Sequence, residues 1–520
     1  MRHYLLLLIA GFIVSLTSCR SDFEFEPSSG GLGFSKDTVY LDTVFTNIGS
    51  STYTLKVYNN SDKDIKIPTL QLGQGEDSKY RLMVDGLPGR VFHDIELLAN
   101  DSMFVFIETT IDYNEFVNQE NTFLYTDRIE FHNSAGTPQL VELVTLVQDA
   151  VFLYPQRDDS GNYESIPVSE TDNTPIYGFN LSHSEHNDEF IWTNTKPYVI
   201  YGYAAVPTGE TLTVNPGARV HFHANSGVIV RNGAVINIGN ETDAATDENF
   251  VVFEGDRLEP DFSDIPGQWG ALWMQEGSSG NLNNAIIKNA TVGIIAEGHD
   301  NTPQTLKLRN VQIYNNSNIG ILARNGHIYG ENVVINMAGE ASLAATLGGI
   351  YTFKHCTFAN YFNSFNQVPV LITDNQETPD AILVADMDAS FENCILYGSS
   401  SLGFLLDRRD ESDSTAFNYK FTNSFIKFVD NTNRFRNNPL YDFDNPLLFE
   451  DCLIAENSTT LKPEYEDPEN NKLNISDESA ANGIGSTTVA AQVPFDIKNT
   501  ARSTTAPDAG AYESVAFSED

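Results

Sequence analysis

The chain has 520 residues, a length that allows two or three domains, and 41% of them are hydrophobic, which is ample for a core. Its 71 acidic residues outnumber its 30 basic ones and give a net charge of −41. Phosphate contacts need clustered Lys and Arg, so this balance argues for no nucleic acid partner and makes bare anionic surfaces poor partners. Abundant Phe (33), Tyr (22) and Gly (36) favour strands and turns over helices. The acidity itself is explained by the solubility of an exported protein.

The N-terminus has the pattern of an export signal. Arg2 precedes an apolar run, residues 4–16, which ends in Leu16-Thr-Ser-Cys19. The run is too short to span a bilayer as a mature helix, so residues 1–18 are predicted to be a secretory signal peptide. The Leu-x-small-Cys ending resembles the lipobox of bacterial lipoproteins, which implies that Cys19 is acylated and anchors the protein to a membrane.

Residues 19–33 are predicted to be an acidic, flexible tether. The stretch 21–26 alternates acidic and Phe residues, and the stretch 27–31 is rich in Ser and Gly. It resembles the acidic export segments that send some Gram-negative lipoproteins to the outer face of the outer membrane, although a solvated tether has the same composition. The expected location is therefore the outer membrane, with the protein facing the cell exterior.

Residues 34–150 contain runs in which apolar and polar residues alternate, such as 52–58, 103–107 and 141–147. Alternation of this kind predicts half-buried strands, and their number suggests an immunoglobulin-like β-sandwich without the Cys pair of antibody domains. Nothing in the stretch has the pattern of a catalytic site, so we expect a spacer or docking module. Residues 151–197 show little periodicity and are predicted to be an irregular connection.

One short phrase recurs between residues 282 and 454, at intervals of 22 to 38 residues. Apolar residues occupy its first, fourth and sixth positions, so the alternation of an extended strand slips by one at the third position. Asn tolerates the left-handed conformation, so the slip predicts a corner between two short strands. The predicted corner residues are Asn284, Asn310, Asn332, His355, Asn393, Asn423 and Asp451.

Two short strands joined by a corner, repeated once per coil, predict a parallel β-solenoid over residues 198–460, with coils about 4.8 Å apart. The corner residues are then expected to bond to one another along the stack rather than to a ligand. The fourth position of the phrase holds Cys356, Cys394 and Cys452 where other coils have small residues. We therefore expect buried thiols there rather than a metal site or a nucleophile, with a disulfide only where the geometry allows one.

Three runs within the predicted coils resemble those of a known class of exported protein. Residues 216–222 (Pro-Gly-Ala-Arg-Val-His-Phe), 253–258 (Phe-Glu-Gly-Asp-Arg-Leu) and 266–273 (Pro-Gly-Gln-Trp-Gly-Ala-Leu-Trp) are similar to segments of bacterial lipoproteins that carry a right-handed parallel β-helix behind an immunoglobulin-like domain. The resemblance implies an all-β protein with its domains in that order. Residues 461–520 are predicted to be a polar loop and a closing segment, because 480–485 and 507–513 resemble the part of such proteins in which a final strand shuts the exposed end.

Catalysis by a β-helix protein would need charged side chains gathered on one outward face. Parallel β-helix families include pectate lyases, which hold Ca²⁺ with several Asp and use Arg or Lys as the base, and polygalacturonases, which use paired Asp. The candidates here are Asp386, Asp388, Asp407, Arg408, Arg409 and Asp410, with Asp374 and Asp380 nearby. An enzyme should bring at least three of these into one groove, whereas solvated loops would explain the same charges. The Asn-Thr-Asp element of polygalacturonases is not found.

A binding role needs a long face with aromatic and polar side chains that can follow an extended glycan. Trp192, Trp269 and Trp273 are available, although Trp269 is expected to be packed. Asp300 and Asp430 have Asn neighbours and could join a Ca²⁺ site, but such pairs mark turns more often, and no cofactor is expected. The leading hypothesis is a membrane-anchored protein whose coils bind polysaccharide or another surface partner without catalysis. A polysaccharide lyase or glycoside hydrolase, and a structural spacer, are the alternatives.

Overall fold

A computed structural model describes residues 24–517, except 117–121, 170–171, 187, 299–304, 380, 410–414 and 458. The chain divides into two compact units, Met1–Asp149 and Ala150–Asp520. Almost every regular element in the described residues is a strand, so the predicted all-β class is confirmed. The predicted signal peptide and Cys19 lie outside the described residues. No helix in the described part has the length and apolarity that crossing a lipid bilayer requires.

The first unit is a sandwich of two sheets with a core between them. Alternating residues of both sheets point inward, and Leu55, Ile107 and Leu143 are among those fully buried. One sheet has, in spatial order, β2 (Gly33–Phe34), β4 (Tyr53–Tyr58), β9 (Ser102–Thr109), β6 (Tyr80–Val84) and β7 (Leu87–Gly89). The other has β1 (Glu26–Pro27), β5 (Ile65–Leu72), β10 (Thr122–His132), β11 (Gln139–Gln148) and β3 (Thr38–Phe45), with β8 (Val91–Leu97) also beside β5.

The sandwich begins earlier than the sequence predicts. Strand β1 pairs in parallel with β5, and the following Ser28 and Leu32 are buried. The prediction of a flexible tether that extends to residue 33 is therefore wrong for residues 26–33, because backbone bonds and apolar contacts hold them against the sandwich.

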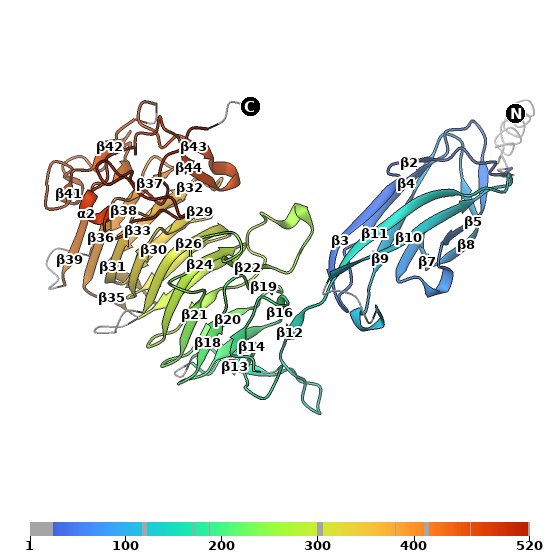
Figure 1. Cartoon of the computed structure of the whole chain (residues 1–520), viewed down its shortest axis with the longest axis horizontal. Coiled ribbons are helices and arrows are strands. Elements are labelled where there is room, and N and C mark those ends of the chain that lie inside the picture. Colours follow the sequence, from blue (N-terminus) through green and yellow to red (C-terminus); the bar gives the residue numbers. More distant parts are fainter. Residues whose placement is uncertain are drawn as a thin grey trace, which may run out of the picture. The chain divides into compact units, whose positions relative to one another are not determined.

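The second unit is a stack of coils, and each coil contributes up to three short strands. First and second strands belong to a 19-stranded sheet and third strands to a 10-stranded sheet, and successive coils pair in parallel, as expected for a β-solenoid. Figure 1 shows the strands of successive coils side by side. The hand of the coil stays a prediction.

The strands of the stack have the following bounds. The first strands are β15 (Ile191–Trp192), β18 (Thr211–Val214), β21 (Val235–Ile238), β28 (His327–Glu331), β31 (Gly349–Lys354), β36 (Met387–Glu392), β39 (Phe417–Thr422) and β41 (Phe449–Glu450). The second strands are β12 (Val151–Leu153), β16 (Tyr198–Ile200), β19 (Arg219–Phe222), β22 (Val251–Gly255), β29 (Val334–Ala338), β32 (Thr357–Asn360), β37 (Ile395–Gly398), β40 (Phe425–Lys427) and β42 (Leu453–Ala455). Strands β24 (Ser279–Lys288) and β26 (Leu306–Asn316) run through the corner and serve as both. The third strands are β14 (Pro175–Asn180), β17 (Tyr203–Val206), β20 (Gly227–Val230), β23 (Leu272–Met274), β25 (Val292–Glu297), β27 (Ile319–Arg324), β30 (Ala341–Thr346), β33 (Val368–Thr373) and β38 (Phe404–Asp407).

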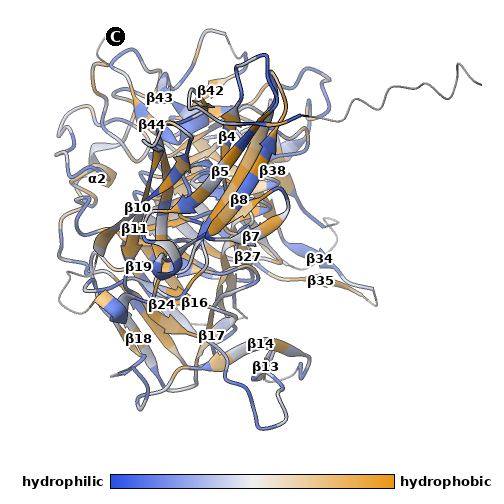
Figure 2. Cartoon of the chain, turned by 90° about the vertical axis from the view of Figure 1, so that its right-hand side faces the viewer, coloured by the Kyte–Doolittle hydropathy of each residue, from blue (hydrophilic) through white to orange (hydrophobic). Residues whose placement is uncertain are grey.

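The core of the stack is built from columns of like side chains. Figure 2 shows hydrophobic and hydrophilic residues close together along the strands, as expected when one face of each strand is buried. The first position of the recurring phrase gives a column of stacked rings. The centroids of Phe353 and Phe391 are 5.5 Å apart, those of Phe391 and Phe421 4.9 Å, and those of Phe421 and Phe449 5.5 Å.

Residues 151–197 belong to the first coils, so the prediction of an irregular connection is wrong there. Strand β12 pairs with β16, β14 with β17 and β15 with β18, and β13 (Ser165–Pro167) forms a hairpin with β14. Trp192 is fully buried in these coils. Short strands of two to six residues, broken by polar turns, give too little periodicity to be recognised before their partners are known.

The end of the stack is closed by a loop rather than by a final strand, which corrects the prediction for the C-terminus. Tyr441 and its neighbours Leu440, Phe443 and Leu448 pack on the exposed end of the core. The C-terminal segment, residues 461–517, instead runs along the side of the coils and contains the hairpin β43 (Tyr465–Asp467) and β44 (Lys472–Ile475) and the short helix α2 (Thr487–Ala490). Its buried residues Leu473, Ile497 and Tyr512 pack against Tyr314, Val334 and Ala359 of the second strands.

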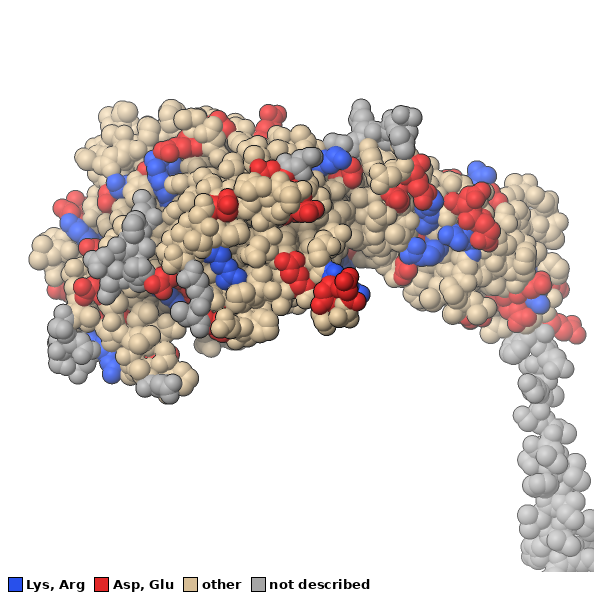
Figure 3. All heavy atoms as spheres, turned by 90° about the horizontal axis from the view of Figure 1, so that it is seen from below, with Lys and Arg blue, Asp and Glu red and all other residues tan. Residues whose placement is uncertain are grey.

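Charged side chains are spread over the surface. On the face seen in Figure 3, acidic side chains lie over both units with basic ones among them. The face drawn shows no continuous basic area among the described residues.

Candidate functional site

The predicted catalytic residues lie around one corner of the coils, between third and first strands. The buried Asp374 carboxylate accepts hydrogen bonds from the Arg409 backbone N–H (2.9 Å) and the Asn375 side chain (3.1 Å). The Asp386 carboxylate accepts one from the Ala416 backbone N–H at 2.8 Å. These carboxylates therefore fix loop backbone.

The other predicted catalytic residues are dispersed at the same corner. Asp388 is exposed on β36, Asp407 is exposed at the end of β38, and Arg408 lies over the ring of Phe417 at 6.0 Å. Asp300, Asp380 and Asp410 lie outside the described residues. None of the described candidates lines any of the cavities discussed below. The structure thus brings several candidates near one another but not into a groove.

The seven predicted corner residues all have left-handed backbone, with φ between 46° and 54°. The Asn310 side chain donates to Asn284 and the Asn332 side chain to Asn310, both at 2.9 Å, and the Asn393 and His355 side chains are 2.9 Å apart. We call this column the corner ladder. Because each left-handed residue turns the strand, the ladder places the second strands at an angle to the first.

The C-terminal segment covers the corner ladder. Backbone carbonyl groups of the segment accept hydrogen bonds from Asn side chains of the ladder. The bonds to the segment backbone run from Asn332 to Phe495 (2.9 Å), from Asn393 to Ser486 (3.1 Å) and from Asn423 to Ile484 (3.1 Å). Burial, and then the nearby Arg502 guanidinium, hold the pKa of the His355 ring well below its ordinary value. The ladder is therefore a structural feature and presents no open binding site where the segment covers it.

The predicted core thiols are all free of disulfides. Cys356 and Cys394 are fully buried, whereas Cys452, near the last coil, is only half-buried. Burial raises the pKa of the Cys394 thiol well above its ordinary value and that of Cys452 to about 12. A thiol that stays protonated is a poor nucleophile and a poor metal ligand, so Cys394 and Cys452 act as small packing groups of the coils.

The described residues contain no group of three or more His, Cys, Asp or Glu placed to hold a metal ion. Asp430, considered above as a Ca²⁺ ligand, accepts bonds from the backbone N–H groups of Arg434 (2.9 Å) and Phe435 (2.8 Å). Burial alone would raise the pKa of this carboxyl, but these N–H groups outweigh it and lower the pKa. Asp430 therefore shapes a turn.

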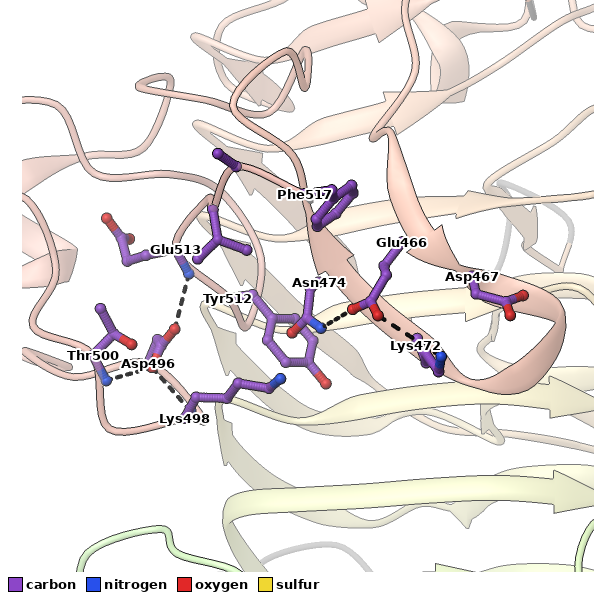
Figure 4. Close-up of a pocket in the computed structure, with 12 residues that line it drawn as sticks. Glu466, Asp467, Lys472, Asn474, Asp496, Lys498, Thr500, Tyr512, Glu513 and Phe517 are labelled. Atoms are coloured by element: carbon purple, nitrogen blue, oxygen red, sulfur yellow. Dashed lines mark hydrogen bonds and ion pairs between the residues drawn. The ribbon is translucent and has the colours of Figure 1, made fainter. Parts of the chain in front are cut away.

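A cavity of about 540 Å³ opens within the C-terminal segment, and we call it the side cavity. The hairpin β43–β44 contributes Glu466 and Lys472 to its lining, and the stretch after α2 contributes Lys498 and Thr500. Figure 4 shows the ring of Tyr512 at the centre of the lining, between these two groups. Ligand pockets commonly have volumes of roughly 300–1,000 Å³, so the side cavity is large enough for a sugar residue or two.

Two carboxylates of the lining are already used by the fold. Asp496 accepts bonds from the backbone N–H groups of Lys498 (2.9 Å), Thr500 (2.7 Å) and Glu513 (3.0 Å). The Glu513 carboxylate, which points away from the cavity in Figure 4, pairs with the buried Arg502 guanidinium at 2.9 Å. Burial raises the pKa of Glu513, against the lowering effect of its bonds. Neither carboxylate has the freedom that a general acid or base at this cavity would need.

Other polar groups of the side cavity remain available. The Lys498 ammonium and the Thr500 hydroxyl make no hydrogen bond or ion pair with any residue in the described part of the chain. Lys472 and Glu466 lie 3.8 Å apart, a distance at the limit of an ion pair, and the Asn474 amide donates to Glu466 at 2.6 Å. Burial raises the pKa of Tyr512 to about 12, so its hydroxyl stays protonated. The cavity therefore offers donors and acceptors around an aromatic ring.

The sequence reasoning missed this cavity because its lining comes from residues 466–517, which it assigned to a polar loop and a closing segment. The only available signal was the density of Lys, Glu, Asp and Asn between Glu464 and Asn474. The predicted Trp residues do not contribute. Trp192 and Trp269 are buried, and the indole N–H of the half-buried Trp273 donates to Glu297 at 3.0 Å.

No protein-family model matches the chain, and no curated protein is similar to it. Among solved structures, a family 123 glycoside hydrolase from Clostridium perfringens is 11% identical over 22% of this chain and 25% of its own. The periplasmic chaperone SfaE is 14% identical over 23% of this chain and 58% of its own. A PapD-like domain of human CEP192 is 12% identical over 26% of this chain and 94% of its own. The TM-score is 0.16 in each case, too low to support any conclusion about function.

Proposed function

We propose that this protein is a lipid-anchored cell-envelope protein that binds a glycan in the side cavity without catalysing a reaction. The observation that carries the proposal is an aromatic ring in the lining of a cavity that also has polar side chains, two of which have no partner in the described residues. The largely buried Tyr512 ring lines the cavity, Lys498 and Thr500 supply donors without a partner in the described residues, and Glu466, which already accepts from Asn474, supplies an acceptor, all on a cavity of about 540 Å³.

This combination suits a sugar because a sugar ring has both apolar C–H faces and a rim of hydroxyl groups. The apolar face packs on an aromatic ring, and the hydroxyl groups bond to side chains that have no partner of their own. A side chain that is already bonded within the protein would have to lose that bond before it could bind a ligand, which reduces the net gain. Lys498 and Thr500 have no such bond to lose within the described residues.

Binding without chemistry follows from the way the carboxylates are used. Glycoside hydrolysis requires two carboxyl groups that face the same bond, one of which must deliver a proton. Here Asp496 is held by three backbone N–H groups and Glu513 by Arg502. The other two carboxylates of the lining each accept a side-chain amide, Glu466 from Asn474 (2.6 Å) and Asp467 from Asn470 (2.8 Å). The more distant candidates, Asp374 and Asp386, are bonded to loop backbone. A hydrolytic or lyase activity has no support from the described residues.

The membrane anchor in this proposal rests on the sequence Leu16-Thr-Ser-Cys19. Acylation of Cys19 would attach the protein to the outer membrane, and the acidic stretch that follows suits display at the cell exterior. Mass spectrometry of the protein purified from its own membrane tests this part, since Cys19→Ala should lose the acyl mass and the membrane association together. An unmodified Cys19 in the mature protein would contradict it.

The binding part is tested by a glycan array probed with the full chain, followed by an assay of reducing-end release on every hit. We expect Lys498→Ala to weaken binding about tenfold, because a hydrogen bond to a charged group contributes about 1.5–3 kcal/mol. Lys462→Ala, an equal loss of charge in the same segment outside the cavity, is the matched control. Absence of any retained glycan would reject the proposal, and released oligosaccharide would replace it with an enzymatic function.

A further inference from the structure

A second cavity, of about 370 Å³, is lined mainly by the loop between β40 and β41, and we call it the end cavity. Aromatic side chains form much of its lining: Phe428, Phe435, Tyr441 and Phe443. Phe428 and Tyr441 are buried and belong to the cap of the core, and their ring centroids are 5.1 Å apart. Phe435 and Phe443 are only half-buried, so part of each ring remains accessible.

The shape of the end cavity is set by a turn that begins at Asp430. Its carboxylate bonds to the backbone N–H groups of Arg434 and Phe435, which holds the turn closed. Asn433 and Asn437 have left-handed backbone, with φ of 54° and 67°. These two left-handed residues lie in the loop that places three polar side chains around the cavity. The three side chains are Asn433, Arg436 and Asn437.

Four polar side chains of the end cavity have no hydrogen-bond or ion-pair partner within the described residues. Arg436 and Glu456 line the cavity, yet neither makes a hydrogen bond or ion pair there, and the Asn433 and Asn437 amides are equally free. Arg436 therefore differs from Arg324 and Arg502, each of which holds a Glu at 2.9 Å, because its exposed guanidinium has no carboxylate partner in the described part of the chain.

We propose that the end cavity is a second ligand site and that it takes a sugar residue bearing a carboxylate. The planar guanidinium of Arg436 matches a carboxylate with two parallel N–H bonds, which an ammonium cannot do. The apolar face of the sugar lies against Phe435 and Phe443, and Asn433, Asn437 and Glu456 bond to its hydroxyl groups. This site is separate from the side cavity, so either site can fail without the other.

The large negative charge of the protein does not forbid an anionic ligand. Charges farther away than the Debye length, about 8 Å at physiological ionic strength, are largely screened, so the nearby groups decide. Besides Arg436, the guanidinium of Arg434 lies 5.3 Å from the Phe435 ring centroid. Of the carboxylates, Asp430 is bonded to backbone N–H groups, and Glu456 is the acceptor that remains.

The test uses isothermal titration of the full chain with two acidic oligosaccharides, a glucuronate-containing tetrasaccharide and a sialylated trisaccharide, each also as its carboxylate methyl ester. We expect at least one acidic form to bind, and its ester to bind at least about tenfold more weakly, since a charge-assisted bond contributes about 1.5–3 kcal/mol. Arg436→Ala should weaken the acidic form by the same factor and leave the ester unchanged. Arg436→Lys should restore binding only in part.

Arg408→Ala, the loss of an Arg elsewhere on the coils, is the matched control and should bind normally. Because Arg436 is exposed, its substitution should leave the thermal unfolding curve unchanged. The proposal is overturned if neither acidic sugar binds, if the ester binds equally well, or if Arg436→Ala has no effect. If Lys498→Ala abolishes binding of the acidic sugar while Arg436→Ala does not, the sugar belongs to the side cavity, and only the end-cavity proposal fails.

Discussion

The corner ladder and the side cavity are both built from polar side chains of the second unit, but they use these side chains in opposite ways. In the ladder, Asn310 and Asn332 bond to the next corner residue or to the C-terminal segment. In the cavity, Lys498 and Thr500 have no partner within the described residues. Polar groups that bond within the protein hold the fold together, whereas exposed polar groups that bond only to water can exchange that water for a ligand.

The largest effect is expected when the buried Arg502, which joins the C-terminal segment to the corner ladder, is replaced. The Arg502 guanidinium bonds to Glu513 and to the Asn332 side chain (2.7 Å). We expect Arg502→Met to destabilise the second unit by about 3–5 kcal/mol, because Glu513 is left as a buried, unpaired charge. Urea unfolding measures the loss. The double variant Arg502→Met with Glu513→Gln should recover part of it, and equal losses in both variants would show that the charge is not the cause.

Substitution of a single residue of the corner ladder should reduce stability by a smaller amount. Asn393 bonds to His355 and, through both atoms of its amide, to the backbone of Ser486. We expect Asn393→Ala to cost about 2–3 kcal/mol, from the lost bonds and from Ala in a left-handed conformation. Asn393→Gly loses the same bonds without that strain, so it should be about 1 kcal/mol more stable than Asn393→Ala. Equal unfolding midpoints for the two variants would contradict the left-handed corner.

The buried His355 should make the ladder sensitive to acid. Its pKa in the folded protein is depressed, so below the ordinary value near 6.5 the unfolded chain takes up a proton that the folded protein does not. Stability is therefore fully present above about pH 6.5 and falls by up to about 1.4 kcal/mol per pH unit below it. His355→Asn, which restores the commonest corner residue, should flatten this dependence between pH 6.5 and 5. An unchanged slope would show that His355 does not titrate on unfolding.

The smallest effect is expected from a substitution in the lining of the side cavity. We expect Thr500→Val to weaken glycan binding about fivefold, because a neutral hydrogen bond contributes about 1 kcal/mol, and to change stability by less than about 0.5 kcal/mol. Thr505→Val, at an exposed position outside the cavity, should change neither. A large loss of stability in Thr500→Val would place this hydroxyl with the ladder rather than with the cavity.

Much of the fold could be predicted from the sequence, and the reasons are local. A corner needs a residue that accepts positive φ, and a strand needs alternating burial. The recurring phrase therefore indicated the seven corner residues, the first of which is Asn284 and the last Asp451. Where the local signal was weak, the prediction failed. Strands β12 to β15 are too short to show a period. The loop around Tyr441 has no sequence pattern that distinguishes a loop covering the end of the core from any other aromatic loop. Burial of Cys356 and Cys394 follows from the same pattern, but the half-exposure of Cys452 depends on its place near the last coil.

The sequence by itself determined the all-β class, the order of sandwich and coils, and the corner residues, because each depends on backbone preferences within a few neighbouring positions. Only the tertiary structure decided that the C-terminal segment lies along the coils, and that it covers the corner ladder and forms the side cavity. It also decided which polar groups have partners. Whether Arg502 or Arg436 holds a carboxylate depends on residues far apart in the chain, and no local pattern contains that information.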